Sequence, residues 1–363
     1  MIAAMVSALV PCYGDLHLLE RSLPRLLASS VGELEVVLVN NDQRQSEGVA
    51  ALSASCGDAR VRVLELEHQA GFARAVNAGI EATTGELVFL ANSDLFVTES
   101  YLAEIERLFR ARPRAGAATG KILRYDLARD EETRILDTTG HLIGRDRGMS
   151  DRGENVEDVG QYELEEQVFG VSGAALVARR EALESVKVRG EYLDESLFMY
   201  KEDVDLSWRL RLAGWECWYV PRAVAHHART SVAPAGHEHV SGFRAFHENE
   251  RVKPEHVRVH SMKNQWLLLV KNEDGANFLR HLPFIAARET LVLGYNTLFA
   301  PRITLAAVRG FAGALSASLE SRRAVKARQV ASPREIRRWF VARSQSTAVI
   351  RGARPERGAV DAG

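Results

Sequence analysis

Four short apolar runs recur within the first hundred residues, and amphipathic stretches separate them. The runs are MVSALV (5–10), LEVVLV (34–39), VRVLEL (61–66) and ELVFLA (86–91). Leucines at three- and four-residue spacing follow the first run, as on one face of a helix. Strands and helices that alternate at this rhythm predict βαβ units, and hence a mainly parallel central sheet flanked by helices on both faces.

Polar segments follow three of these runs, at residues 11–15, 40–42 and 92–94. Ligands of open α/β sheets bind beyond the carboxyl ends of the strands, so we expect a ligand site there. The first loop, PCYGD, lacks the glycine pattern of a nicotinamide dinucleotide site, and the chain contains no GxxxxGK[ST] phosphate loop. A phosphate-bearing ligand would therefore need a metal ion. Asp94, just past a buried strand, can hold Mg²⁺ or Mn²⁺, although such a residue alone is more often a turn or cap.

A second cluster of acids lies in FMYKEDVDLSWRLRLAGW, residues 198–215. A helix that begins near Asp203 would bury Val204, Trp208 and Leu212 on one stripe and point the Asp203 carboxylate into a cleft. The positive end of the helix dipole would offset the cost of keeping that charge there. Asp205 either caps this helix or pairs with Arg209. The competing interpretation is a solvated first helical turn.

Charge divides the chain unevenly. Residues 251–363 hold 20 Lys and Arg against 8 Asp and Glu, which leaves 27 against 40 for residues 1–250. Arginines recur there within apolar helical sequence, which predicts contact with an anionic membrane surface. Packing on the first domain and a homodimer interface are the alternatives. Arg and Trp are not interleaved as a base-stacking platform, so we expect no nucleic-acid partner.

We therefore divide the chain into a catalytic domain (1–250), a basic, apolar helical region facing membrane or partner (251–340) and a disordered tail (341–363). The glycine-rich segment 126–165 is expected to be a long loop with short strands that lines the site. Three separated cysteines (Cys12, Cys56, Cys217) argue against a disulfide scaffold or zinc cage and favour the cytoplasm. The basic C-terminal region adds the expectation of peripheral attachment to the inner face of the cell membrane. No uninterrupted apolar run is long enough for a spanning helix.

The order of these segments resembles the inverting glycosyltransferases of family 2, which have the GT-A nucleotide-diphospho-sugar transferase fold. The carrying blocks are ALVPCYGD, VVLVNNDQ, HQAGFARAVNAGIEATTGELVFLANSDLFV and YKEDVDLSWRLRLAGW, over roughly residues 5–231. Asn92-Ser93-Asp94 matches the N-P-D form of the family's metal motif, and Val224-Ala225-His226 matches a V-x-H segment that often assists it.

The resemblance implies a role for each matching residue. Asp203 would take the proton from the acceptor hydroxyl, and Glu202 would orient neighbouring groups. Asp94 and His226 would hold the metal, with His227 as the neighbouring candidate, and Gly173 and Trp208 would lie on the acceptor side. The residues implied in nucleotide binding are Pro11, Tyr13, Asn40, Gly71, Phe72, Asn77 and Asn92.

The donor would be a nucleotide-diphosphate sugar, and the acceptor a glycan or lipid-linked glycan of the cell envelope. Asn40 replaces the Asp that reads the pyrimidine base, but its carbonyl can still accept the N3–H. The segment 137–153 and Gln161-Tyr162 look most like rhamnosyltransferases, which use dTDP-L-rhamnose. A sugar nucleotidyltransferase would want a glycine-rich basic loop after the first strand. A catalytically inactive sugar-binding protein would not be expected to keep both Asp94 and Asp203.

Overall fold

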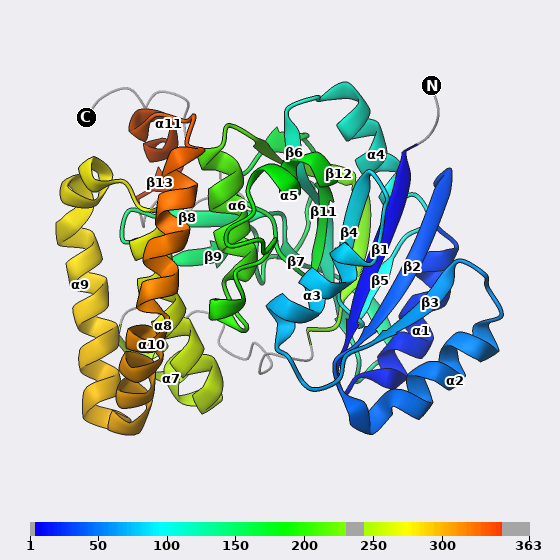
Figure 1. Ribbon diagram of the computed structural model, residues 1–363, viewed down its shortest axis with the longest axis horizontal. Coiled ribbons are helices and arrows are strands. Elements are labelled where there is room, and N and C mark those ends of the chain that lie inside the picture. The colour runs from blue at the N-terminus through cyan, green and yellow to red at the C-terminus, as the bar shows by residue number, and fades with distance from the viewer. Residues whose placement is uncertain (1–3, 230–242, 343–363) are drawn as a thin grey trace.

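The computed structural model describes residues 4–229 and 243–342 (Figure 1). A ten-stranded sheet has the order β10-β12-β6-β11-β4-β1-β2-β3, with β5 paired to β12 and β7 to β6. The strands of this sheet are β1 (Met5–Cys12), β2 (Glu33–Asn40), β3 (Val61–Glu65), β4 (Leu87–Ala91), β5 (Leu95–Val97), β6 (Ala115–Asp126), β7 (Glu131–Thr138), β10 (Glu166–Gln167), β11 (Ala175–Arg179) and β12 (Glu216–His227).

Helices cover both faces of the sheet and form the C-terminal part of the described chain. They are α1 (Leu16–Leu27), α2 (Ser46–Cys56), α3 (Phe72–Glu81), α4 (Tyr101–Ala111), α5 (Arg180–Ser185), α6 (Glu202–Leu212), α7 (Phe243–Val252), α8 (Glu255–Asn272), α9 (Gly275–Phe299), α10 (Pro301–Ala327) and α11 (Pro333–Arg337). Short 3₁₀ turns lie at η1 (Gln43–Gln45) and η2 (Glu195–Leu197).

The predicted parallel core is confirmed. The four apolar runs form β1 to β4, and β1 pairs in parallel with β2 and β4. Successive side chains of a strand point to opposite faces. Val6, Ala8 and Val10 of β1 therefore join the core under α1, α2 and α4, whereas Leu9 joins the core under α3, α5 and α6. The antiparallel β11 lies between β4 and β6, so the sheet is largely but not wholly parallel.

The segment after α6 differs in detail from the sequence pattern, which suggests two short strands around Pro221. The structure has one strand, β12, whose register against β6 shifts between Val220 and Val224. Proline lacks an N–H for the ladder, and such a shift accommodates it within a single strand. This irregularity sets which side chains at the end of β12 face the site.

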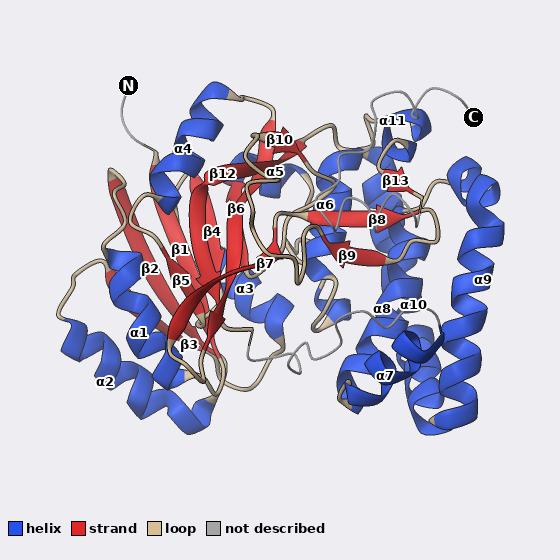
Figure 2. Cartoon of the chain, turned by 180° about the vertical axis from the view of Figure 1, so that it is seen from behind, coloured by secondary structure: helices blue, strands red, loops and turns tan. Residues whose placement is uncertain are grey.

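The 126–165 segment forms β7, β8 (His141–Gly144) and β9 (Met149–Asp151). The last strand of the described chain, β13 (Phe340–Val341), pairs with β8 in a second sheet of order β13-β8-β9. This small sheet lies between the central sheet and the C-terminal helices (Figure 2).

The C-terminal helices pack on the first domain, and α8 makes buried polar contacts with it. Lys271 of α8 is fully buried and lies 2.8 Å from the Asp205 carboxylate of α6. The side-chain amide of Asn272, the next residue of α8, donates a hydrogen bond of 2.8 Å to the same Asp205 carboxylate. Of the alternatives for this region, packing on the first domain is thus observed for α8. No helix among the described residues is long and apolar enough to cross a bilayer.

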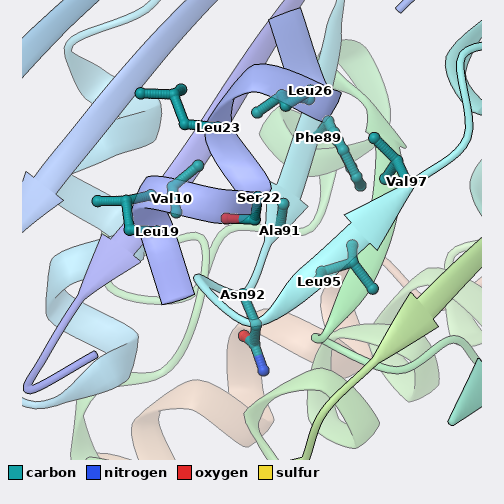
Figure 3. A pocket seen from close by; sticks show the side chains of 10 residues that line it. All are labelled: Val10, Leu19, Ser22, Leu23, Leu26, Phe89, Ala91, Asn92, Leu95 and Val97. Carbon is teal, nitrogen blue, oxygen red and sulfur yellow. The ribbon is translucent and has the colours of Figure 1, made fainter. Parts of the chain in front are cut away.

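A cavity of about 10 Å³ lies between α1 and the sheet, lined mainly by apolar side chains (Figure 3). It has room for at most one water molecule. The side chain of Asn92, which follows β4, points away from the other side chains around this cavity.

Candidate active site

The end of β4 and the end of β12 bring Asp94 and His227 together. His227 pairs with Leu95 in the β12–β5 ladder, which places its ring beside the Asn92–Asp94 turn. Its Nε2 lies 3.1 Å from Asp94 Oδ1 and 3.4 Å from the Asn92 amide nitrogen. Its Nδ1 lies 2.8 Å from Asp137 Oδ2 of β7. Burial lowers the pKa of His227, but Asp94 and Asp137 together raise it to about 10.

His226 faces the other way. Adjacent residues of a strand alternate between its two sides, and the His226 Nδ1 lies 3.8 Å from Glu132. Burial lowers its pKa. Of the two candidate histidines, His227 is therefore the partner of Asp94, and His226 lies on the opposite side of β12, beside Glu132.

Asp94 and His227 fit a divalent cation. A carboxylate oxygen and an imidazole nitrogen 3.1 Å apart can bind one ion, and Asp137 holds the second ring nitrogen as a carboxylate commonly does for a metal-binding histidine. Binding would require the neutral imidazole and would displace its proton. Among the described residues no group of three or more His, Cys, Asp or Glu is arranged to hold a metal. Further oxygen ligands would have to come from a bound molecule or from water.

Asp203 lies at the start of α6, as predicted, on a helix that begins at Glu202. Its Oδ2 accepts a 2.8 Å hydrogen bond from the Gly173 N–H and lies 3.7 Å from His141 Nε2. A methyl group at Gly173 would lie 3.4 Å from the Asp203 Cβ, in ordinary van der Waals contact, so the two segments pack closely here. The Asp203 side chain keeps 19% of its surface exposed, enough for a small group to reach it.

A series of side-chain contacts joins the Asp94–His227 pair to Asp203. We call Asp137, Arg229, Asp151 and His141 the bridging cluster. Arg229 lies 3.4 Å from Asp137 and 3.1 Å from Asp151. His141 Nε2 lies 3.6 Å from Asp151 and, as above, 3.7 Å from Asp203. Asp94 and Asp203 therefore belong to one continuous group of polar side chains.

Two acids beside Asp203 have different environments. Asp205 is fully buried and accepts from Arg209 Nε at 2.8 Å, which confirms the predicted pairing. Glu202 is also buried, and its Oε2 has no hydrogen-bond partner among the described residues. Burial, and secondarily the charges of Asp203 and Asp205, raise the pKa of Glu202 to about 8.

Two of the expected nucleotide-binding side chains are turned to other partners. Asn40 is fully buried, donates to Ser46 and Glu65 at 2.8 and 2.7 Å, and accepts from the Asp42 N–H. Asn77 exchanges hydrogen bonds of 2.8 Å with the backbone of Leu193. Neither presents a free polar atom for a ligand, because both hold local structure.

The other expected nucleotide-binding residues stay near the strand ends. Pro11 is the residue before the end of β1. Tyr13 is exposed, and the Arg44 guanidinium lies 5.9 Å from its ring centroid. Gly71 precedes α3, which begins at Phe72, and has a positive φ of 81°. These positions lie at the edge of the sheet where a ligand is expected.

Trp208 does not lie on the acceptor side. Its side chain is 2% exposed and makes edge contacts with Phe169 and Phe340, with ring centroids 5.9 Å away in each case. Val204 and Leu212 share this core, so the predicted stripe is confirmed. Trp208 anchors α6 and cannot touch an acceptor from there, which corrects our expectation for it.

Sequence reasoning did not single out the bridging cluster. The sequence predicted only that segment 126–165 as a whole lines the site. Asp137, His141 and Asp151 belong to that segment. Their mutual approach depends on the β8–β9 pairing, in which His141 stands opposite Asp151. Neither residue has a motif around it.

Comparison with known proteins identifies the family of the chain. The sequence profile of the family described as "Glycosyltransferase like family 2" matches residues 3–238. The chain belongs to glycosyltransferase family 2. The predicted family and the GT-A fold are thereby confirmed.

Individual family 2 relatives are distant. The N-acetylglucosaminyl-diphospho-decaprenol L-rhamnosyltransferase of Mycobacterium tuberculosis is 31% identical over 245 residues, covering 60% of this chain and 75% of that protein. The uncharacterized protein y4gI of Sinorhizobium fredii is 26% identical over 265 residues, which is 72% of this chain. This chain spans only 27% of y4gI and under half of other leading relatives, such as 48% of the poly-beta-1,6-N-acetyl-D-glucosamine synthase of Staphylococcus epidermidis.

Among solved structures, GalNAc-T7 with UDP, GalNAc and Mn²⁺ superposes with a TM-score of 0.51 at 12% identity. The match covers 81% of this chain and 55% of that one. At this identity the likeness concerns the fold alone.

Proposed function

We propose that this family 2 member is an inverting glycosyltransferase that moves a sugar from a nucleotide-diphosphate donor to a hydroxyl group. Asp203 takes the proton of the acceptor hydroxyl as that oxygen bonds to the anomeric carbon. The bond from that carbon to the diphosphate oxygen breaks on the opposite face, and the electron pair leaves with the nucleoside diphosphate. The supporting observation is the continuous contact from Asp94 through the bridging cluster to Asp203.

The chain orients this base by simple means. The Gly173 N–H fixes one carboxylate oxygen of Asp203, and the Val204 N–H lies 2.7 Å from the other. The first turn of α6 offers a positive dipole end that stabilises the carboxylate. Trp208 locks the helix in the core, so the carboxylate is held in one direction.

Asp94 and His227 would hold Mg²⁺ or Mn²⁺ at the donor side. A bound divalent cation would offset the charge that builds on the departing diphosphate. Asp137 orients the His227 ring for this role through its 2.8 Å contact.

For the donor we propose dTDP-L-rhamnose. The support is the rhamnosyltransferase-like 137–153 segment together with the 31% identity to the mycobacterial rhamnosyltransferase. The base-reading role expected for Asn40 is dropped, because its side chain is buried and fully engaged.

For the acceptor we propose a lipid-linked or growing cell-envelope glycan, met at the inner face of an anionic membrane. The supporting feature is the set of exposed apolar side chains on α9 and α10, which we call the apolar face. Its large exposed side chains are Leu279, Leu282, Phe284, Leu291, Leu293, Leu298, Phe299, Leu305, Val308 and Leu319. Residues 275–327 carry seven Lys or Arg and two Glu, so basic charge accompanies this surface. Helices that expose apolar side chains together with basic ones can be attracted to the surface of anionic bilayers.

A thermal-shift panel with dTDP, UDP and GDP, each with and without Mn²⁺, tests the donor side. We expect a metal-dependent rise in Tm with dTDP, because a ligand that binds only the folded state stabilises it. Stabilisation by UDP or GDP alone would change the donor. No response to any diphosphate would contradict the proposed function.

A further inference from the structure

The backbone just before Asp203 has an unusual conformation. Phe198, Tyr200 and Lys201 have φ values of 65°, 67° and 68°, although none is glycine. Residues other than glycine rarely adopt this left-handed region of φ, because their Cβ comes too close to the following carbonyl oxygen. Such strain persists only where the surroundings hold it, and it gathers at functional sites. We call residues 196–201 the base loop, because α6 and Asp203 follow it directly.

Helix α8 of the C-terminal region contacts the base loop mainly through hydrogen bonds from one side chain, Asn264. Asn264 is fully buried, and its Nδ2 donates to three backbone carbonyls. The distances are 3.0 Å to Leu197, 2.8 Å to Met199 and 2.7 Å to Tyr200. The amide orientation follows from these contacts, because a flipped side chain would set its oxygen against three oxygens.

Neighbouring α8 residues reinforce this grip. Lys263 Nζ donates to the Ser196 carbonyl at 2.8 Å, and Gln265 Oε1 accepts from Lys201. The His260 ring stacks on Phe198 with centroids 5.3 Å apart. Four residues within two turns of one helix thus contact the base loop.

The other side of the base loop rests on the donor-side helix α3. The Phe198 carbonyl accepts from the Ala73 N–H at 3.2 Å. A methyl group at Gly71 would lie 2.5 Å from the Phe198 ring, so only glycine permits this approach. The base loop is therefore clamped between α3 and α8.

We propose that Asn264 is a positioning residue, which holds the base loop in its left-handed conformation and so sets the direction of the Asp203 carboxylate. This inference rests on the proposed role of Asp203 as the base. It gives the C-terminal region a part in catalysis that no motif in its sequence indicates.

The test compares Asn264→Asp with Asn277→Asp. Both positions are fully buried asparagines whose Nδ2 donates to backbone carbonyls, but Asn277 contacts Pro333 in α11, away from the base loop. Each substitution removes donors at almost unchanged volume. For Asn264→Asp we expect kcat to fall on the order of 10²-fold, as for a displaced catalytic group, with KM for the donor within about threefold. Asn277→Asp should change neither by more than about threefold. Equal losses of kcat in the two variants would overturn the proposal.

An Asp203→Asn background separates positioning from general damage. If Asn264 acts through Asp203, Asn264→Asp lowers the residual rate of Asp203→Asn no further. A loss of the same size in both backgrounds would contradict this.

Hydrogen exchange gives a readout that does not depend on activity. Exchange of the amides at residues 198–205 should accelerate in Asn264→Asp and stay unchanged in Asn277→Asp. Unchanged exchange in both would overturn the clamp. If the wild-type chain transfers no sugar, the proposed function fails, and the exchange result still decides whether Asn264 holds the base loop.

Discussion

Asp94 and Asp203 are both carboxylates, but their surroundings suit them to different chemistry. Asp94 is nearly enclosed and faces an imidazole nitrogen at 3.1 Å, as a metal ligand would. Asp203 keeps part of its surface open and is fixed by two backbone N–H groups, as a base that must meet a mobile hydroxyl would be.

Asp203→Asn should abolish most sugar transfer and leave nucleotide binding intact. Asparagine keeps the shape and can still accept the Gly173 N–H, but it cannot take a proton. We expect a rate loss on the order of 10³-fold, measured by release of nucleoside diphosphate. Calorimetric titration with the same diphosphate is the control and should change less than about threefold. Normal turnover would show that another group is the base.

His227→Ala and His226→Ala form a matched pair on opposite sides of β12. His227→Ala should remove the Mn²⁺-dependent part of the thermal shift produced by the diphosphate, because one of two protein ligands is lost. His226→Ala should keep it. The reverse result would restore the histidine expected from the sequence motif.

Glu202→Gln tests the buried acid next to the base. The folded-state pKa of Glu202 is raised from 4.5 to about 8. Between these values the folded chain keeps a proton that the unfolded chain has released, so stability falls as the pH rises through this window. Glutamine removes the effect. At pH 9 the free energy of unfolding of Glu202→Gln should therefore exceed that of the wild type by several kcal/mol, because each unit of pKa shift corresponds to about 1.4 kcal/mol. At pH 4 the two proteins should melt together. A difference that is largest at pH 4 would refute this.

The role of a residue could be predicted only where local secondary structure determines which way its side chain points. The start of α6 and the stripe of Val204, Trp208 and Leu212 follow from helical spacing. The choice between His226 and His227 does not, because it depends on strand phase. The register shift between Val220 and Val224 sets that phase, and its position is fixed by tertiary pairing.

At the scale of elements, α6 and α8 are joined by buried charges. Lys271 is fully buried between Asp194 and Asp205. Its charge lowers the pKa of Asp194 against the opposing effect of burial. A basic helical region separate from the catalytic domain was expected, but the sequence does not show that one of its lysines faces two acids from another region.

Lys271→Met should therefore destabilise the whole chain. Removing Lys271 takes one cation from two buried carboxylates, which then keep only their arginine partners, Arg189 for Asp194 and Arg209 for Asp205. The expected cost is about 3–5 kcal/mol. Chemical denaturation should show this loss in a single transition, because α8 unfolds with α6. The control is Lys253→Met, whose partly exposed pair with Glu250 at 2.7 Å should contribute less than about 1 kcal/mol. A small loss for Lys271→Met, or two separate transitions, would show that the helical region is an independent unit.

On the scale of the whole molecule, the alternation of strands and helices sufficed to predict the sheet, since each apolar run needs cover on both faces. The placement of α8 to α10 was left open between membrane, partner and catalytic domain. The structure shows α8 packed inward, while α9 and α10 turn the apolar face outward.

The apolar face can be tested with vesicles. Replacing Leu298 and Phe299 together by Glu should reduce co-flotation with phosphatidylglycerol vesicles at least tenfold, since both are more than half exposed and would enter the bilayer boundary. Val159→Glu, an equally exposed apolar position elsewhere, should bind like wild type. Light scattering tests the alternative, a homodimer interface. If the wild type is a dimer that does not bind vesicles, and the double substitution dissociates it, the apolar face is a contact with a second copy of the chain.

The central claim is that the donor-side cation and the base share one site. The most direct measurement is a crystal structure with Mn²⁺ and the stabilising diphosphate, with the metal located by its anomalous signal. We predict the metal peak at Asp94 and His227, with the terminal phosphate between it and Asp203. A metal peak elsewhere, or a diphosphate that Asp203 does not face, would contradict the account.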